Sequence, residues 1–169
     1  MRVGKLLALV SILTAVGVSG AYSQNSAVEA VRPPQPMTNS AAARAKLTLL
    51  YRFSGVRDGN AGPWAIATAV FCSNPTASPV TIRLRMFGLS GIKYADVFYT
   101  VEPFYTHTAV SRSIATYPLN LNLNISAISQ GMGEIRVSNT RVLCTAQVID
   151  ALGAPPAFVS SLRMERYEP

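Results

Sequence analysis

Apolar and polar residues alternate along most of this chain after residue 46, and a period of two predicts β-strands with one buried face. The clearest run is 119–126, where leucine or isoleucine fills every odd position and asparagine or serine every even one. A helix would spread these apolar side chains around its circumference, whereas a strand places all of them on one side. The same alternation gives a second strand an apolar face of Val80, Ile82, Leu84 and Met86.

Glycine, proline, asparagine and aspartate separate these runs and divide the region into about nine strands. The predicted strands are 47–54, 64–73, 79–87, 92–101, 105–112, 119–126, 132–138, 141–150 and 157–166. Short strands without helical crossovers predict an all-β fold, namely an antiparallel β-sandwich of immunoglobulin-like architecture. Segment 64–73 is apolar on both faces, with small alanines on one of them, so we expect a central strand that is covered on both sides.

The N-terminal residues follow a different pattern, with Arg2 and Lys5 ahead of the apolar run 6–18 and small residues after it. A basic start, an apolar stretch and a small-residue cleavage site are typical of a secretory signal peptide. The run is also shorter than the roughly 20 apolar residues that cross a bilayer as a helix. We therefore expect 1–23 to be a signal peptide of a secreted or periplasmic protein that keeps no stable membrane span after cleavage.

Residues 24–45 are rich in proline, alanine and serine and show no apolar periodicity. Such a composition predicts a flexible or extended leader. The β-sandwich domain is then expected to occupy residues 46–169.

The chain has two cysteines, Cys72 and Cys144. In an exported protein such a pair most simply forms one intramolecular disulfide, and the alternative is two separate buried thiols. Both cysteines lie in alternating sets that face apolar neighbours. The spacing is compatible with a bond inside one sheet and with a bond between two sheets.

The segments around the cysteines carry a resemblance. Residues 67–74 read ATAVFCSN and residues 139–151 read NTRVLCTAQVIDA. They resemble an uncharacterised family of small exported bacterial proteins, in which a first strand ends in Cys followed by Asn and a late strand carries Cys-Thr-Ala and then Asp-Ala. The resemblance extends over most of 64–166. It implies a β-sandwich with paired cysteines and brings no known activity, cofactor or catalytic residue.

Charge and motifs disfavour several function classes. The formal net charge of +7 becomes +5 without Arg2 and Lys5, and the basic residues are dispersed, so we expect no nucleic-acid partner. His107 is the only histidine, which leaves no imidazole pair for zinc or copper. The chain also has no Gly-x-Ser-x-Gly elbow, and Gly131-Met132-Gly133 is expected to be a turn before a strand. We expect no cofactor, no metal and no enzymatic activity.

Aromatic residues concentrate between positions 94 and 117. In strands such side chains more often pack cores and cross-strand pairs, but they also form recognition surfaces. For a surface, the candidate partner-binding residues are Tyr94, Tyr99, Tyr105 and Arg112. The predicted function is a non-enzymatic exported module that binds an envelope protein or glycan. The alternatives are a small outer-membrane β-barrel and a hydrolase with an unrecognised site.

Overall fold

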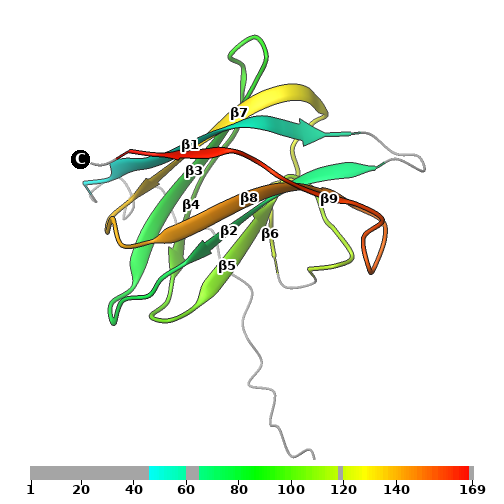
Figure 1. Cartoon of the computed structure of the whole chain (residues 1–169). Coiled ribbons are helices and arrows are strands. Elements are labelled where there is room, and N and C mark those ends of the chain that lie inside the picture. The colour runs from blue at the N-terminus through cyan, green and yellow to red at the C-terminus, as the bar shows by residue number, and fades with distance from the viewer. Residues whose placement is uncertain (1–45, 60–64, 118–119, 168–169) are drawn as a thin grey trace, which may run out of the picture. The chain divides into compact units, whose positions relative to one another are not determined.

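The computed structural model describes residues 46–59, 65–117 and 120–167. In these ranges the chain forms ten strands and no helix, arranged as two five-stranded sheets (Figure 1). Sheet A has the order β10-β1-β7-β3-β4 and contains β1 (Thr48–Asp58), β3 (Val80–Gly88), β4 (Lys93–Val101), β7 (Ile128–Val137) and β10 (Met164–Arg166). Sheet B has the order β6-β5-β2-β8-β9 and contains β2 (Ile66–Ser73), β5 (Thr106–Val110), β6 (Leu121–Asn122), β8 (Leu143–Asp150) and β9 (Val159–Ser161).

The expected all-β sandwich is therefore confirmed. All strand pairings are antiparallel except the short pairing of β5 with β6. The predicted signal peptide 1–23 and leader 24–45 lie outside the described residues.

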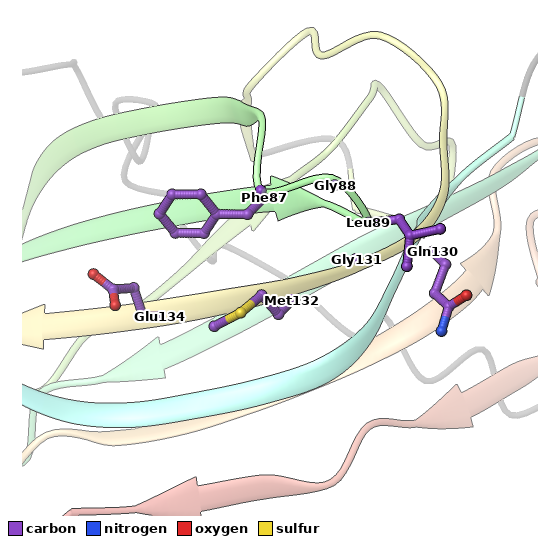
Figure 2. Close-up of a pocket in the computed structure, with 8 residues that line it drawn as sticks. Phe87, Gly88, Leu89, Gln130, Gly131, Met132 and Glu134 are labelled. Atoms are coloured by element: carbon purple, nitrogen blue, oxygen red, sulfur yellow. The ribbon is translucent and has the colours of Figure 1, made fainter.

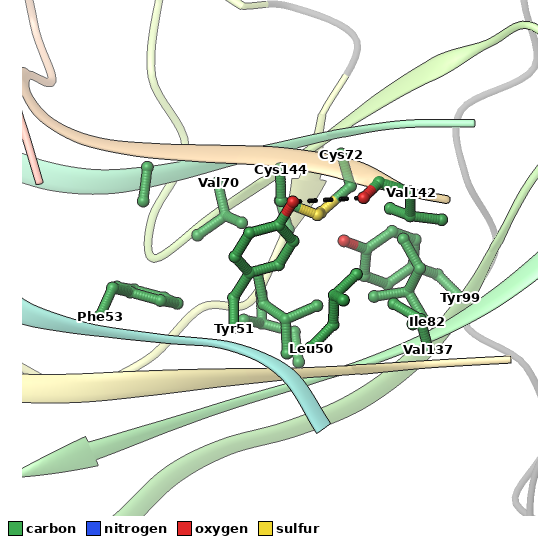
Figure 3. Close-up of a cluster of buried hydrophobic side chains, with 14 of the residues drawn as sticks. Leu50, Tyr51, Phe53, Val70, Cys72, Ile82, Tyr99, Val137, Val142 and Cys144 are labelled. Atoms are coloured by element: carbon green, nitrogen blue, oxygen red, sulfur yellow. Dashed lines mark hydrogen bonds between the residues drawn. A yellow bond between two sulfur atoms is a disulfide. The ribbon is translucent and has the colours of Figure 1, made fainter. Parts of the chain in front are cut away.

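The main core lies between the two sheets and is built by the apolar faces that alternation predicts. On β3 every second side chain from Val80 to Met86 is buried. Figure 3 shows Tyr51 reaching from β1 toward sheet B, where its hydroxyl donates to the carbonyl of Val142 at 3.3 Å. Cys72 and Cys144 form a disulfide beside this contact (Figure 3). They are directly opposed on β2 and β8, with Cα atoms 4.2 Å apart, so the bond joins two strands of one sheet.

A second, smaller core covers the outer face of sheet B. Ala65, Ala67 and Ala69 line that face near β2, and the segment after β5 packs over them through Ile114 and Tyr117. The Tyr117 ring meets the Phe71 ring edge-on at 5.1 Å and its hydroxyl accepts a hydrogen bond from Gln147. The small alanine side chains leave room for this cover. The prediction of a central strand buried on both sides is confirmed for β2.

The run 119–126 is the largest departure from the predicted strands, because of its described residues, 120–126, only Leu121–Asn122 pairs as β6. Asn124 has a positive φ of 46° and its amide donates to the side chain of Asn122. Asparagine favours such local turns, which compete with a strand ladder. Leu121 is nevertheless buried, and Leu123 and Ile125 pack against the main core. The alternation predicted the inward side chains correctly and the strand wrongly.

Two other predicted strands differ in their bounds. The segment 157–166 forms β9 and β10 in different sheets, so the described residues make ten strands rather than nine. Leu162 packs against the main core where the chain crosses over. β7 begins at Ile128, so Gly131 and Gly133 lie inside a strand and not in a turn. A Cβ at Gly133 would collide with the ring of Phe53, which explains the glycine there.

Candidate functional site

The structure does not bring the four predicted partner-binding residues together. Tyr99 is fully buried between the sheets (Figure 3), and burial raises the pKa of its hydroxyl. Tyr94 is half-buried and packs against the main core, while Tyr105 is 44% exposed beyond the other end of β4. Tyr99 therefore takes the core role, and a surface that contains it does not form.

Arg112, the fourth candidate, belongs to a buried polar network. Its guanidinium donates to both carboxylate oxygens of Asp58, which is 1% exposed at the end of β1. The hydroxyl of Ser111 also donates to Asp58, at 2.6 Å, and accepts from the backbone amide of Thr68 at 3.0 Å. A buried carboxylate needs such partners. The network links β1 of sheet A to sheet B, so Arg112 has a structural role.

His107 also faces the interior. It lies opposite Cys72 on β5, its ring stacks on Tyr99 at 6.4 Å, and its Nδ1 is buried without a hydrogen-bond partner among the described residues. Burial lowers the pKa of His107, and the charge of Glu102 opposes that shift. In the described part of the chain no group of three or more His, Cys, Asp or Glu side chains is placed to hold a metal ion.

The outer face of sheet A is different, because charged side chains form a row across all five strands. The strand registers place one member of this charged row on each strand, in the order Glu165, Arg52, Glu134, Arg85 and Asp96. The signs alternate, and neighbouring strands lie about 4.8 Å apart. Opposite charges on directly opposed residues favour this register.

Glu134 is the centre of the charged row. Its side chain is only 7% exposed and contacts three guanidinium groups, those of Arg52, Arg85 and Arg136. One carboxylate cannot neutralise three cations, so this group of four side chains keeps a formal charge of +2. Burial and the nearby charges of Arg83 and Arg136 lower the pKa of Arg85. The Nε of Arg85 is buried and has no hydrogen-bond partner in the described ranges.

Asp96 ends the charged row at β4. Arg83 donates to both of its carboxylate oxygens, at 2.7 and 2.9 Å, and Lys93 donates to it at 2.8 Å. The hydrogen bond from Arg83, with a smaller one from Lys93, lowers the pKa of Asp96 from 3.8 to about 2, against the opposing effect of burial. The Asp96 carboxyl therefore stays ionised. Together with Arg83 and Lys93 it forms a second group in which cations outnumber acids.

Aromatic rings orient several of these arginines. The guanidinium of Arg83 lies 4.9 Å from the ring centre of Phe98, that of Arg85 lies 5.7 Å from Phe87, and that of Arg52 lies 5.3 Å from Tyr167. Such cation–π contacts hold a planar guanidinium flat. We call this outer surface of sheet A the arginine face. Its cations are Arg52, Arg83, Arg85, Lys93, Arg136 and Arg163, and its acids are Asp96, Glu134 and Glu165.

An apolar pocket opens at one end of the arginine face (Figure 2). It has a volume of about 390 Å³ and lies where β3 ends and β7 begins. Phe87, Leu89 and Met132 are its large apolar lining residues, and Glu134 also lines it. Leu89 is 76% exposed, so the pocket is open to solvent.

No protein-family model, no curated protein and no solved structure matches this chain. In the part of the chain that the structure describes, no helix is long and apolar enough to cross a membrane. Neither the charged row nor the pocket was predicted. The arginines and acids of the charged row do occupy the polar positions of the alternating runs. Which of these positions share a row depends on strand order, which alternation does not give.

Proposed function

We propose that this protein is an exported β-sandwich module that binds an acidic polysaccharide of the cell envelope through its arginine face. The observation that carries the proposal is the group of three arginines held by the single carboxylate of Glu134. Export is inferred from the signal-like residues 1–23, and a disulfide within the fold supports an oxidising compartment.

The chemistry of the arginine face favours carboxylate groups as ligands. Five of its six cations are arginines, and a guanidinium binds a carboxylate through two parallel hydrogen bonds. The contacts with Glu134 and with aromatic rings fix the guanidinium groups before a ligand arrives, which reduces the entropy lost on binding. The excess of positive charge gives an acidic ligand a favourable field across the sheet.

The arrangement favours an extended ligand over a single small anion. Arg52, Arg85 and Arg136 surround Glu134, but they come from three adjacent strands. A second cationic group, around Asp96, lies on the edge strand β4, so positive charge extends across the sheet. A polysaccharide with regularly spaced carboxylates can meet several of them at once. Each contact is exposed and weak, and the sum of several contacts gives useful affinity.

The test uses polygalacturonate as the probe and dextran as a neutral control polymer. The protein should bind immobilised polygalacturonate, fail to bind dextran, and lose affinity as salt is raised, since salt screens exposed charges. The Arg136→Gln substitution removes a charge-assisted hydrogen bond and should weaken binding about tenfold. Arg141→Gln is the matched control, because Arg141 is exposed in the turn between β7 and β8.

Equal binding of both polymers would contradict the proposal. An Arg136→Gln protein that binds polygalacturonate as well as the Arg141→Gln control would also contradict it.

A further inference from the structure

The turn that joins β4 to β5 carries an aromatic residue in an unfavourable backbone conformation. The amide of Tyr105 donates to the carbonyl of Glu102 at 3.1 Å, Pro103 is the second residue of the turn, and Phe104 is the third, with φ of 63°. This is a type II turn, whose third position requires positive φ and therefore favours glycine or asparagine. A bulky side chain at this position is disfavoured, because its Cβ approaches the following carbonyl.

Packing does not compensate for this conformation, since Phe104 is 75% exposed. The turn is nevertheless held firmly by the buried Asn74. The backbone amide of Phe104 donates to the Asn74 carbonyl at 2.8 Å, and the backbone amide of Asn74 donates to the Tyr105 carbonyl at 2.9 Å. The Asn74 side chain also donates to the carbonyl of Val101 at 3.0 Å. The backbone at Phe104 is thus fixed by hydrogen bonds, while its aromatic side chain protrudes into solvent and has no role in folding that the contacts of the described residues reveal.

A site that fits such a side chain exists at the other end of β3, the strand that pairs with β4. β3 begins beside this turn, since Val80 pairs with Val101, and ends at the apolar pocket of Phe87, Leu89 and Met132 (Figure 2). Nine residues of strand separate the two features, about 30 Å. The pocket, at about 390 Å³, falls in the size range of sites that take small organic groups, so it has room for a phenyl ring.

The charges at the two ends are complementary. Beside Phe104 lies the exposed Glu102, and the loops 74–79 and 102–105 contain no lysine or arginine. Beside the pocket lies Lys93, which is directly opposed to Phe87 and half-exposed. Lys93 shares the single carboxylate of Asp96 with Arg83, so this end keeps an excess of positive charge. The acidic side chain and the absence of cations disfavour an anionic membrane surface as the partner of the turn.

We propose that Phe104 of one copy of this protein inserts into the Phe87, Leu89 and Met132 pocket of a second copy. Glu102 of the first copy then lies near Lys93 of the second. The two contact surfaces differ, so the association is head to tail and each added copy leaves a free turn at one end and a free pocket at the other. This inference does not rest on polysaccharide binding, because the arginines of the charged row are not needed for it.

Sedimentation velocity of the purified exported protein over a range of concentrations tests the proposal. The wild-type protein should form dimers and longer chains as its concentration rises. The Phe104→Gly substitution removes the aromatic ring and places the preferred residue in the turn, so the fold should keep or gain thermal stability while self-association weakens at least tenfold. Leu89→Asp changes the exposed rim of the pocket and should weaken self-association similarly.

Mixing the two variants gives the sharpest result. The Phe104→Gly protein keeps its pocket and the Leu89→Asp protein keeps its turn, so an equimolar mixture should form a one-to-one dimer although each variant alone stays monomeric. A mixture that remains monomeric, or a wild-type protein that is monomeric at every concentration, would overturn the proposal. Loss of binding to phosphatidylglycerol vesicles in Phe104→Gly, with wild type monomeric, would assign the turn to a membrane instead and would equally overturn it.

Discussion

The outer faces of the two sheets are built from opposite kinds of residue. The outer face of sheet B presents small alanines near β2 and is closed by the segment that carries Ile114 and Tyr117. The outer face of sheet A presents an arginine or an acid of the charged row on every strand, and most of these described side chains form ion pairs with one another. A loop can approach small apolar side chains closely, whereas long charged side chains need water or ion partners.

Because of this difference, we expect sheet B to contribute mainly to stability and the arginine face of sheet A to contribute mainly to binding. Sheet B contains the disulfide and a second core, so substitutions there are expected to change the free energy of unfolding. The exposed ion pairs of the arginine face contribute little to folding, whereas the buried carboxylate of Glu134 depends on its arginine partners. The ordered charges of this face are therefore available to a ligand, and substitutions there are expected to change binding first.

The largest expected effect on stability comes from the disulfide of sheet B. Replacing both Cys72 and Cys144 with alanine removes a cross-link that closes a loop of 72 residues. In the chain-entropy treatment this lowers the free energy of unfolding by about 4 kcal/mol. Denaturant unfolding of the two proteins measures the difference. A loss below about 1 kcal/mol would show that the cross-link does not stabilise the covered sheet.

The next largest expected effect on stability comes from a substitution in the cover of sheet B, compared with one on the open side of sheet A. Ile114→Ala removes a buried side chain from the cover of sheet B and should cost about 3 kcal/mol. Leu89→Ala trims a side chain that is exposed on the open side and should change stability by less than about 0.5 kcal/mol. Both are measured by the same unfolding experiment. Equal losses of unfolding free energy in the two variants would contradict the distinction between the two faces.

The smallest effect concerns the pH dependence of the arginine face. The pKa of Asp96 is about 2 in the folded protein and 3.8 ordinarily, because Arg83 and Lys93 stabilise its charged form. Its contribution to stability is therefore complete above pH 4 and is lost as the pH falls toward 2. The group is close to solvent, so the contribution is about 1 kcal/mol or less.

Asp96→Asn tests this contribution. The wild-type protein should lose more unfolding free energy between pH 4 and pH 2 than the variant does. Identical slopes for the two proteins would mean that the contacts of Asp96 do not persist in solution.

Alternation along the chain predicts elements well where strands pair regularly on both sides. The predicted strand 79–87 is found as Val80–Gly88, and its inward residues are those of the apolar face. Alternation fails at 119–126 because asparagine side chains make local hydrogen bonds that compete with the ladder. It also fails at 157–166, where a single alternating run changes sheets at Leu162.

The candidate site was less predictable because it depends on contacts between distant segments. Arg52 meets Glu134 only through the register of β1 with β7, and two register shifts in that pairing lie between Leu49 and Val56. The sequence near Arg112 offers no acid to pair with it, because its partner Asp58 lies 54 residues away. Phe104 had a local signal, since Pro103 marks the second position of a turn, but its exposure depends on the fold.

We propose that the arginine face of sheet A, and not the covered face of sheet B, is the binding surface. The most direct measurement is an NMR titration of the isotope-labelled protein with oligogalacturonate, followed through backbone amide shifts. We expect saturable shifts on β1, β7 and β3 around Arg52, Glu134 and Arg85, and unchanged amide shifts at Ala67 and Ile114. Shifts that concentrate on the 111–117 segment, or no shifts on the arginine face at saturating ligand, would contradict it.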